Sequence, residues 1–451
     1  MNKEGKIMKN KSKFGLIIAP IAIAISVSGC GLTKCGDGVC DFPAENCYIC
    51  KRDCLDPNDI CCKPNSPHDG RCANFDCVGD TNCPDVHPQF IRSGRFPKWS
   101  HSKNLIAFDD FIDSNYEILT MEPDGSDVKC LTCNKLNLPR RHKGQPNWDP
   151  SGEYIAFTAE NDEYKRRYFG RDMTVVPGIS GRNNDVWIMT SDGEKSWRIT
   201  NTPENGGVIR TSFSPDGKTL YWNEEYSIEK HGKPSKWSVR RNRLGEKWGL
   251  WRIVMADISF DQGEPCVTNI RKVDINELYT NKVLIEGQGI QPDNEHLVFA
   301  AADISETAGC CYWGGKNVFG YTHWSDIYIT DLDGTNLHRL TTTPYLHNEN
   351  AEFSPDGKKI AFTETRWCVG KSGDIYLMNS DGSNRIRLTH LYNQNCPDDY
   401  LGRYYGSAGD ELNWSADGSK IIFSAIVGDH IEYPYVDFSI YILDIEEFIQ
   451  G

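Results

Sequence analysis

The chain has 451 residues, of which 39% are apolar and 25% are charged, a balance that excludes a disordered chain and a multispanning membrane protein. Its formal charge of −14 disfavours a general nucleic-acid binder, because such proteins are normally basic. The 18 cysteines indicate either an oxidising compartment or a metal site.

The amino terminus has the three parts of a secretory signal peptide. Residues 1–13 are rich in lysine, residues 14–27 are almost wholly apolar, and Val27-Ser28-Gly29-Cys30 follows. The apolar run is too short for a comfortable membrane span. The last four residues resemble a prokaryotic lipobox, which implies that residues 1–29 are removed and that Cys30 carries a lipid. We therefore expect an extracytoplasmic, membrane-anchored lipoprotein, in the periplasm or at the cell surface. The alternative is an uncleaved anchor with an unmodified Cys30.

Residues 30–85 form a cysteine-rich region with few large apolar residues, so cross-links must replace a hydrophobic core. Its ten clustered cysteines are Cys35, Cys40, Cys47, Cys50, Cys54, Cys61, Cys62, Cys72, Cys77 and Cys83. Because an extracytoplasmic compartment is oxidising, we predict a disulfide-rich module whose pairing the spacing leaves open. The Cys-Gly-Asp-Gly-x-Cys string resembles small cysteine-rich modules of extracellular prokaryotic proteins.

Haem and metal binding are the alternatives for this module. Cys47-Tyr48-Ile49-Cys50-Lys51 matches an unusual haem-attachment pattern without the usual histidine, and the cysteine spacing is also compatible with zinc. Carboxylates that suit calcium are Asp37, Asp41, Glu45 and Asp53. Acidic residues are also ordinary turn residues, so we expect no cofactor, with calcium as the alternative.

From residue 86 onward, two motifs alternate along the chain. The first is an aromatic or apolar residue, a turn of the Ser-Pro-Asp-Gly type and an apolar run; its six copies begin at Trp99, Trp148, Phe213, Gln291, Phe353 and Trp414. The second is an apolar and aromatic run, whose six copies begin at Tyr116, Asp185, Leu250, Asp326, Asp374 and Ser439. Four of these runs lead into Asp-Gly turns, at Asp124, Asp192, Asp333 and Asp381, each followed by a short β-type segment.

Each unit therefore predicts four antiparallel strands joined by tight turns. Six such units, at periods of roughly 49 to 77 residues, predict an all-β fold: a six-bladed β-propeller over residues 86–451, preceded by the small disulfide-rich module. The pattern resembles the TolB-type, WD-like propeller repeat over residues 90–450, with long insertions and a degenerate turn in the third and fourth units. Residues 87–93 are predicted to supply the missing outer strand of the last blade, which removes the free edges of an open ring.

Long insertions are predicted on one face of the ring, at residues 160–184, 224–249, 304–325, 391–410 and 427–438. Loops of this length are uncommon unless they are functional. They are basic and aromatic in places, which suggests a partner surface; the alternative is that the aromatic residues only pack. The partner-binding candidates are Arg166, Arg167, Arg240, Arg241, Tyr312, Trp313, Tyr321 and Trp324.

The remaining cysteines suggest disulfides within the propeller. The candidates are Cys130 with Cys133, Cys310 with Cys311, and Cys368 with Cys396. Cys266 is then left over, and a buried unpaired thiol is expected there.

The predicted function is a lipid-anchored propeller that serves as a scaffold at the cell envelope and binds a protein or a glycan through the loop face. No catalysis is expected, since the sequence has no Gly-x-Ser-x-Gly motif and its histidines show no paired metal-ligand spacing. The alternative is a propeller-type polysaccharide lyase or hydrolase that acts through the same loops.

Overall fold

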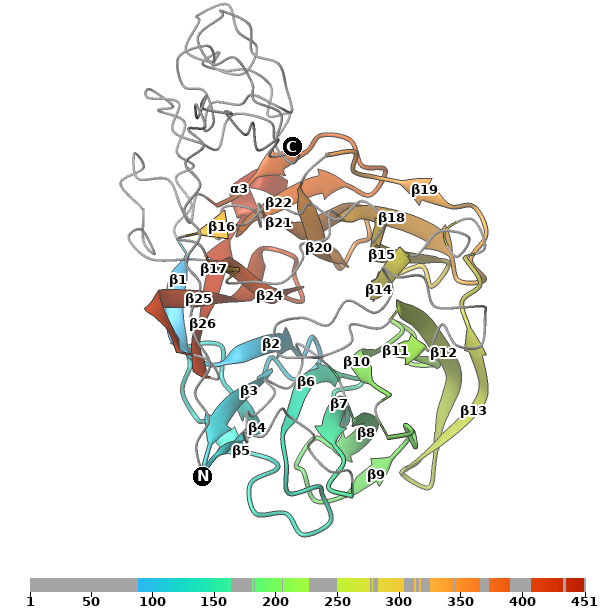
Figure 1. Cartoon of the computed structure of the whole chain (residues 1–451), viewed down its shortest axis with the longest axis vertical. Coiled ribbons are helices and arrows are strands. Elements are labelled where there is room, and N and C mark those ends of the chain that lie inside the picture. The colour runs from blue at the N-terminus through green and yellow to red at the C-terminus, as the bar shows by residue number, and fades with distance from the viewer. Residues whose placement is uncertain are drawn as a thin grey trace, which may run out of the picture.

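Six antiparallel sheets of four strands surround a common centre in the computed structural model (Figure 1). The structure describes residues 88–163, 181, 183–204, 206–226, 250–275, 278, 283–303, 312–313, 316–317, 325–343, 346–365, 373–389, 407–432 and 435–449. A single parallel bridge, between Ser325 and His347, joins the fourth and fifth sheets at their edges. The predicted six-bladed propeller is confirmed.

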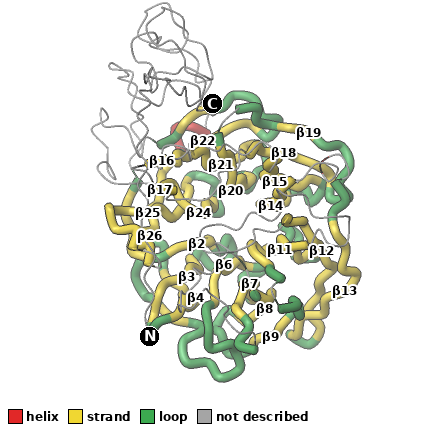
Figure 2. Tube along the Cα trace, in the orientation of Figure 1, coloured by secondary structure: helices red, strands yellow, loops and turns green. Residues whose placement is uncertain are grey.

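The strands run outward from the centre in chain order in blades 1 to 5, whereas in blade 6 the first strand of the chain follows the last (Figure 2). Blades 1 and 2 contain β2 (Arg95–Trp99), β3 (Ile106–Ile112), β4 (Asn115–Met121), β5 (Lys129–Cys130), β6 (Lys143–Trp148), β7 (Tyr154–Glu160), β8 (Asn184–Thr190) and β9 (Ser196–Arg198). Blades 3 and 4 contain β10 (Val208–Phe213), β11 (Thr219–Tyr226), β12 (Leu250–Asp261), β13 (Glu264–Lys272), β14 (Val283–Ile290), β15 (His296–Asp303), β18 (Ser325–Asp331) and β19 (His338–Arg339). Blades 5 and 6 contain β20 (His347–Phe353), β21 (Lys359–Thr365), β22 (Gly373–Asn379), β23 (Ile386–Arg387), β24 (Ser407–Trp414), β25 (Lys420–Glu432), β26 (Tyr435–Asp444) and β1 (Gln89–Ser93).

The hydrophobic core lies between neighbouring blades. One cluster packs Ile118 of blade 1 against Trp148 and Phe157 of blade 2, and all three are buried. The second strands are covered on both faces, which explains their continuous apolar runs, such as Ile155-Ala156-Phe157 in β7.

Each Pro-Asp-Gly or Asp-Gly turn is stabilised by its own aspartate. In the turn of blade 6, Asp417 Oδ1 accepts hydrogen bonds from Ser415 Oγ at 2.6 Å and from Ser419 N at 3.0 Å, and Gly418 takes a φ of 73°. These donors lower the pKa of Asp417 to about 2. The pKa is lowered for the same reason at Asp124, Asp192, Asp333 and Asp381.

We expect the propeller to lose stability in acid, between about pH 4 and pH 2. The folded-state pKa of Asp417 is depressed, so its contribution is present above the ordinary value of 3.8 and is lost as the pH falls towards about 2. Urea unfolding of the wild type and of Asp417→Asn checks this expectation. The difference in midpoint should be constant above pH 5, shrink as the pH falls from about 4 to 2, and be lost below about pH 2, whereas a pH-independent difference would contradict it.

An Asp–Thr–Arg triangle recurs where the third and fourth strands of a blade pair. In blade 5, Asp374 accepts hydrogen bonds from Thr389 Oγ1 at 3.0 Å and from Arg387 Nη2 at 2.6 Å. The Thr389 hydroxyl oxygen also accepts from Ile375 N at 2.9 Å, which fixes the start of β22. The same contacts join Asp185, Thr200 and Arg198 in blade 2, and Asp326, Thr341 and Arg339 in blade 4.

The ring is closed by the first described strand. β1 pairs antiparallel with β26 as the outermost strand of blade 6, with Gln89 opposite Ile442 and Ser93 opposite Ser439. Gly94 then redirects the chain into blade 1 with a φ of 141°, and a Cβ there would lie 2.7 Å from Phe108 Cδ2. The predicted closure by residues 87–93 is therefore confirmed.

Two expectations were wrong in their detail. Most of residues 427–438 are not a loop, because β25 continues to Glu432 and β26 starts at Tyr435. The thiol of Cys266 is free but exposed, because β13 is an outer strand without a buried residue. The chain ends in a short helix, α3 (Glu446–Ile449).

Among the predicted disulfides, Cys130 and Cys133 are bonded, with a Cα–Cα distance of 5.7 Å. The signal peptide with Cys30, the cysteine-rich module with its calcium candidates, and Cys310, Cys311, Cys368 and Cys396 lie outside the described residues. In the described ranges, no helix has the length and apolar character needed to cross a membrane.

Candidate functional site: a charged well at the centre of the ring

The innermost strand of every blade has an irregular register. The shifts fall at Arg95/Lys98, Gly144/Asn147, Ile209/Ser212, Gly287/Gly289, Glu349/Glu352 and Ala408/Leu412. Phe96, Gln145, Arg210 and Asn350 take a positive φ at these shifts. Bulges of this kind re-aim side chains, and they are frequent beside functional sites.

The irregular strands surround a cavity at the centre of the ring, which we call the central well. It contains about 390 Å³ of space that protein atoms do not fill, part of it open to solvent. Two positions of the repeat supply most of its lining. Three residues before the aromatic or apolar end of the strand stand Gln145, Arg210, Gly287, Asn350 and Glu411, and one residue before it stand Lys98, Asn147, Ser212 and Glu352.

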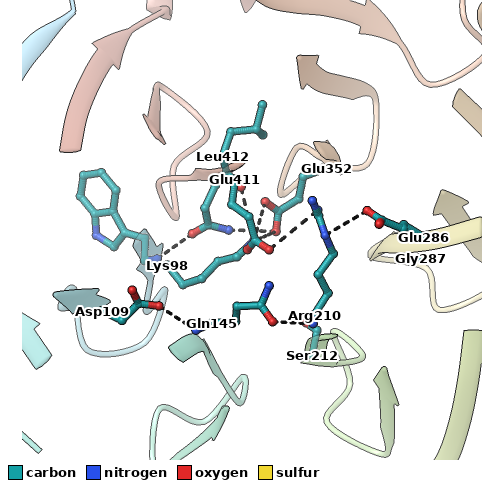
Figure 3. Close-up of polar contacts among 12 residues, drawn as sticks. Lys98, Asp109, Gln145, Arg210, Ser212, Glu286, Gly287, Glu352, Glu411 and Leu412 are labelled. Atoms are coloured by element: carbon teal, nitrogen blue, oxygen red, sulfur yellow. Dashed lines mark hydrogen bonds and ion pairs between the residues drawn. The ribbon is translucent and has the colours of Figure 1, made fainter. Parts of the chain in front are cut away.

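Charges alternate across the well (Figure 3). Lys98 Nζ lies 3.2 Å from Glu352 Oε2 and 3.5 Å from Glu411 Oε2. Arg210 continues the row, with Nη1 3.8 Å from Glu411 Oε1 and Nε 3.4 Å from Glu286 Oε2. The row is therefore Glu352, Lys98, Glu411, Arg210, Glu286, with three carboxylates and two permanent cations.

Burial shapes the ionisation of this row. Burial raises the pKa of Glu352, although Lys98 opposes the shift, and burial likewise raises the pKa of Glu286 against the attraction of Arg210. For Lys98, burial alone would lower the pKa, but Glu352 and Glu411 together outweigh burial and raise it. Lys98 therefore stays protonated, and removing one member of the row would leave the others poorly compensated.

A second set of contacts fixes the backbone of Arg210. Arg95 Nε donates to Asp109 Oδ1, and the other carboxylate oxygen accepts from Gln145 N at 2.9 Å. Gln145 Oε1 in turn accepts from Arg210 N at 3.0 Å. Burial raises the pKa of Asp109 to about 6, although Arg95 opposes the shift. Blades 1, 2 and 3 thus position Arg210 jointly.

Beside the well, Ser325, His347 and Glu349 stand in the order of a nucleophile, base and acid. His347 Nδ1 lies 2.7 Å from Ser325 Oγ, and His347 Nε2 lies 2.9 Å from Glu349 Oε2. However, the Ser325 hydroxyl donates to Asn348 O at 2.8 Å, and Ser325 is only 3% exposed. The Ser325 proton is already used in a hydrogen bond, and its oxygen is shielded from solvent. The three residues therefore join blades 4 and 5, and Ser325 is not placed to act as a nucleophile.

The well was not predictable from the motifs in the sequence. Most of the partner candidates named from the sequence lie outside the described residues: Arg166, Arg167, Arg240, Arg241, Tyr321 and Trp324. The other two, Tyr312 and Trp313, form β16 (Tyr312–Trp313), which pairs with β17 (Lys316–Asn317). The signal that would have found the well is the offset from the strand end, because the same two positions recur in successive units.

Among the described residues, Asp293, Glu295 and His296 are the group whose ligand atoms are close enough to share a metal ion. They lie in an exposed turn of blade 4, away from the central well, and exposed acidic groups of this kind are common without a metal.

No protein-family model matches the chain, and no curated protein matches it. Several solved structures are similar to the chain. TolB from Acinetobacter baumannii is 16% identical, with a TM-score of 0.43, over 76% of this chain and 64% of that one. A putative TolB from Agrobacterium tumefaciens is 19% identical, with a TM-score of 0.39, over 67% and 76% of the two chains. An oligogalacturonate lyase from Vibrio parahaemolyticus is 11% identical, with a TM-score of 0.39, over 81% and 92%.

The chain thus spans about two thirds of the length of the first of these TolB proteins, 64%. At these identities the likeness concerns the fold alone.

Proposed function

We propose that this protein is an extracytoplasmic binding propeller, anchored through Cys30, that holds a protein partner at the central well. The supporting observation is the well itself: all six blades contribute to it, and its charged residues are fixed by neighbours before any ligand arrives. Preorganised polar groups of this kind favour binding, because little side-chain freedom is lost on association. Detergent-phase partitioning of Cys30→Ala tests the anchor.

The chemistry of the well favours binding over catalysis on an acidic glycan. A polyuronide is an anion, and its carboxylates would meet Glu352 and Glu411 in a site with three carboxylates and two cations. Like charges in a site with little water repel strongly. An enzyme that acts on an acidic glycan would therefore need a different part of the molecule.

A plug in the well tests the proposal. Asn147 lines the well, is partly exposed and is held by no side-chain hydrogen bond in the described part of the chain, so Asn147→Trp should fill the space without removing a contact. We expect immobilised wild-type protein to retain a specific protein from solubilised envelopes, and Asn147→Trp to retain at least about tenfold less, a loss equal to about 1.4 kcal/mol.

The control places the same residue elsewhere. Leu136→Trp introduces tryptophan at a side chain that is 97% exposed in a loop of blade 1, so it should retain the partner as well as the wild type does. If the plugged protein retains its partner undiminished while its unfolding midpoint is normal, the central well is not the binding site.

A further inference from the structure

We propose that the central well receives a single basic side chain, lysine or arginine, from the protein partner, and that Glu411 is its main acceptor. This inference rests on the proposed function and adds the chemistry of the ligand. The row Glu352, Lys98, Glu411, Arg210, Glu286 begins and ends with a carboxylate, so its formal charge is one negative unit. One further cation would neutralise it.

Glu411 is the member of the row with acceptor capacity to spare. Its carboxylate is nine-tenths buried, and its contacts with Lys98 and Arg210 are long, at 3.5 Å and 3.8 Å. Within the ranges that the structure describes, it accepts no hydrogen bond from any donor. Glu352 differs, because its Oε1 accepts from Asn413 Nδ2 at 2.9 Å and also faces Lys98. A largely buried carboxylate that has only long ion-pair contacts gains from a donor that hydrogen-bonds to it directly.

A second and independent feature lies in the wall of the same cavity. Thr211 lines the well and is only 2% exposed, and its Oγ1 has no hydrogen-bond partner among the described residues. Buried hydroxyls are normally paired, so an unpaired one in a cavity wall indicates a missing partner. The hydroxyl oxygen of Thr211 and the carboxylate of Glu411 are both acceptors in the lining, so the natural complement is a group with more than one N–H donor. An ammonium or guanidinium group has several N–H donors and meets this requirement.

The lining favours an aliphatic side chain over an amino sugar. Tyr221 is the one aromatic residue of the lining, and it is 2% exposed, so no aromatic face is offered for a sugar ring. Asn147, Ser212 and the glycine at 287 make the rest of the wall small and polar. A cavity with small polar walls and carboxylates suits the aliphatic chain and the charged end group of a lysine or arginine.

Small basic probes test this directly. We expect Nα-acetyl-lysine amide and Nα-acetyl-arginine amide to bind the mature protein in calorimetric titrations, at least about tenfold more tightly than the uncharged Nα-acetyl-norleucine amide. Glucosamine, which has an ammonium group on a sugar ring, should bind no better than the norleucine probe. If glucosamine equals the lysine probe, or if no basic probe binds, the inference is overturned.

Two variants predict changes of opposite sign. Glu411→Gln keeps the shape of the side chain but removes the negative charge, so affinity for the basic probes should fall about tenfold or more, while Glu411→Asp should retain part of it. Arg210→Met removes the cation that competes for Glu411, so affinity should rise. A purely structural role would make both variants weaker, and unfolding midpoints identify any variant that is misfolded. If both variants bind equally weakly although folded, Glu411 is not the acceptor.

The two proposals fail in different ways. If Asn147→Trp abolishes capture of the envelope partner but the wild type ignores every basic probe, the well binds a partner of other chemistry and only this inference falls. If Asn147→Trp captures the partner normally, the proposed function falls as well.

Discussion

Asp374→Ala will lower the free energy of unfolding by about 3–5 kcal/mol, the cost of leaving a buried charge without its partner. Arg387 is 3% exposed and pairs with Asp374 in the triangle of blade 5, and Thr389 depends on the same carboxylate. Without Asp374, the guanidinium keeps its charge and its hydrogen bond to Thr389 O at 2.7 Å, but it loses its anionic partner, and at 3% exposure little water can replace that partner. Urea unfolding measures the loss.

The repeats of the triangle provide matched controls. Arg198 in blade 2 is 30% exposed and Arg339 in blade 4 is 48% exposed, so water can hydrate either guanidinium once its aspartate is removed. Asp185→Ala and Asp326→Ala should therefore cost less than Asp374→Ala, nearer the about 1–3 kcal/mol of a buried acceptor lost from its donors. Equal losses in all three blades would show that the exposure of the arginine does not govern the effect.

Replacing residues 89–93 by a glycine-serine linker of equal length will destabilise the propeller by about 4 kcal/mol and make it aggregate. A glycine-serine segment forms a strand poorly, because glycine loses more conformational entropy than other residues and nothing replaces the packed side chain of Ile91. We therefore expect the four residue pairs that join β1 to β26 to be lost, at about 1 kcal/mol for each ladder hydrogen bond. Their loss also leaves β26 as an open edge that can pair with other chains. Unfolding midpoints and size-exclusion chromatography measure the two effects.

Phe90→Ser is the control for the closing strand. Phe90 is 54% exposed and contacts Tyr441 edge-on at 5.8 Å, and its backbone pairs with Tyr441 whatever its side chain is. This variant should lose only about 1 kcal/mol, the typical value of one aromatic pair, and stay monodisperse. A monodisperse, fully stable linker variant would show that β1 is dispensable for closure.

Blade number and strand order were predictable because their signals are local. A Pro-Asp-Gly turn is defined by neighbouring residues, and the apolar run after it marks the strand that both adjacent blades cover. The limits of β25 and β26 were missed because Gly428 and Asp429 are typical turn residues and yet lie within β25; Ile431 still pairs with Val436 beyond the expected edge.

The well could not be predicted in the same way, because it is assembled from residues far apart in the sequence. Lys98 and Glu411 contact each other only once blades 1 and 6 are neighbours in a closed ring. The bulges that direct these side chains inward depend on backbone angles such as the φ of 52° at Arg210. The identity of a single residue does not predict such an angle. The offset from the strand end is recognisable once one well residue is known.

The closing strand also sets the order of events during biogenesis. Gln89 emerges from the ribosome long before Ile442, its partner across the sheet, so β1 must wait until nearly the whole propeller has been made. Blades 1 to 5 have all their strands in sequence and can form as they are synthesised, but blade 6 and the complete well appear only at the end. Until β26 has been made, β1 has no partner strand in the sheet.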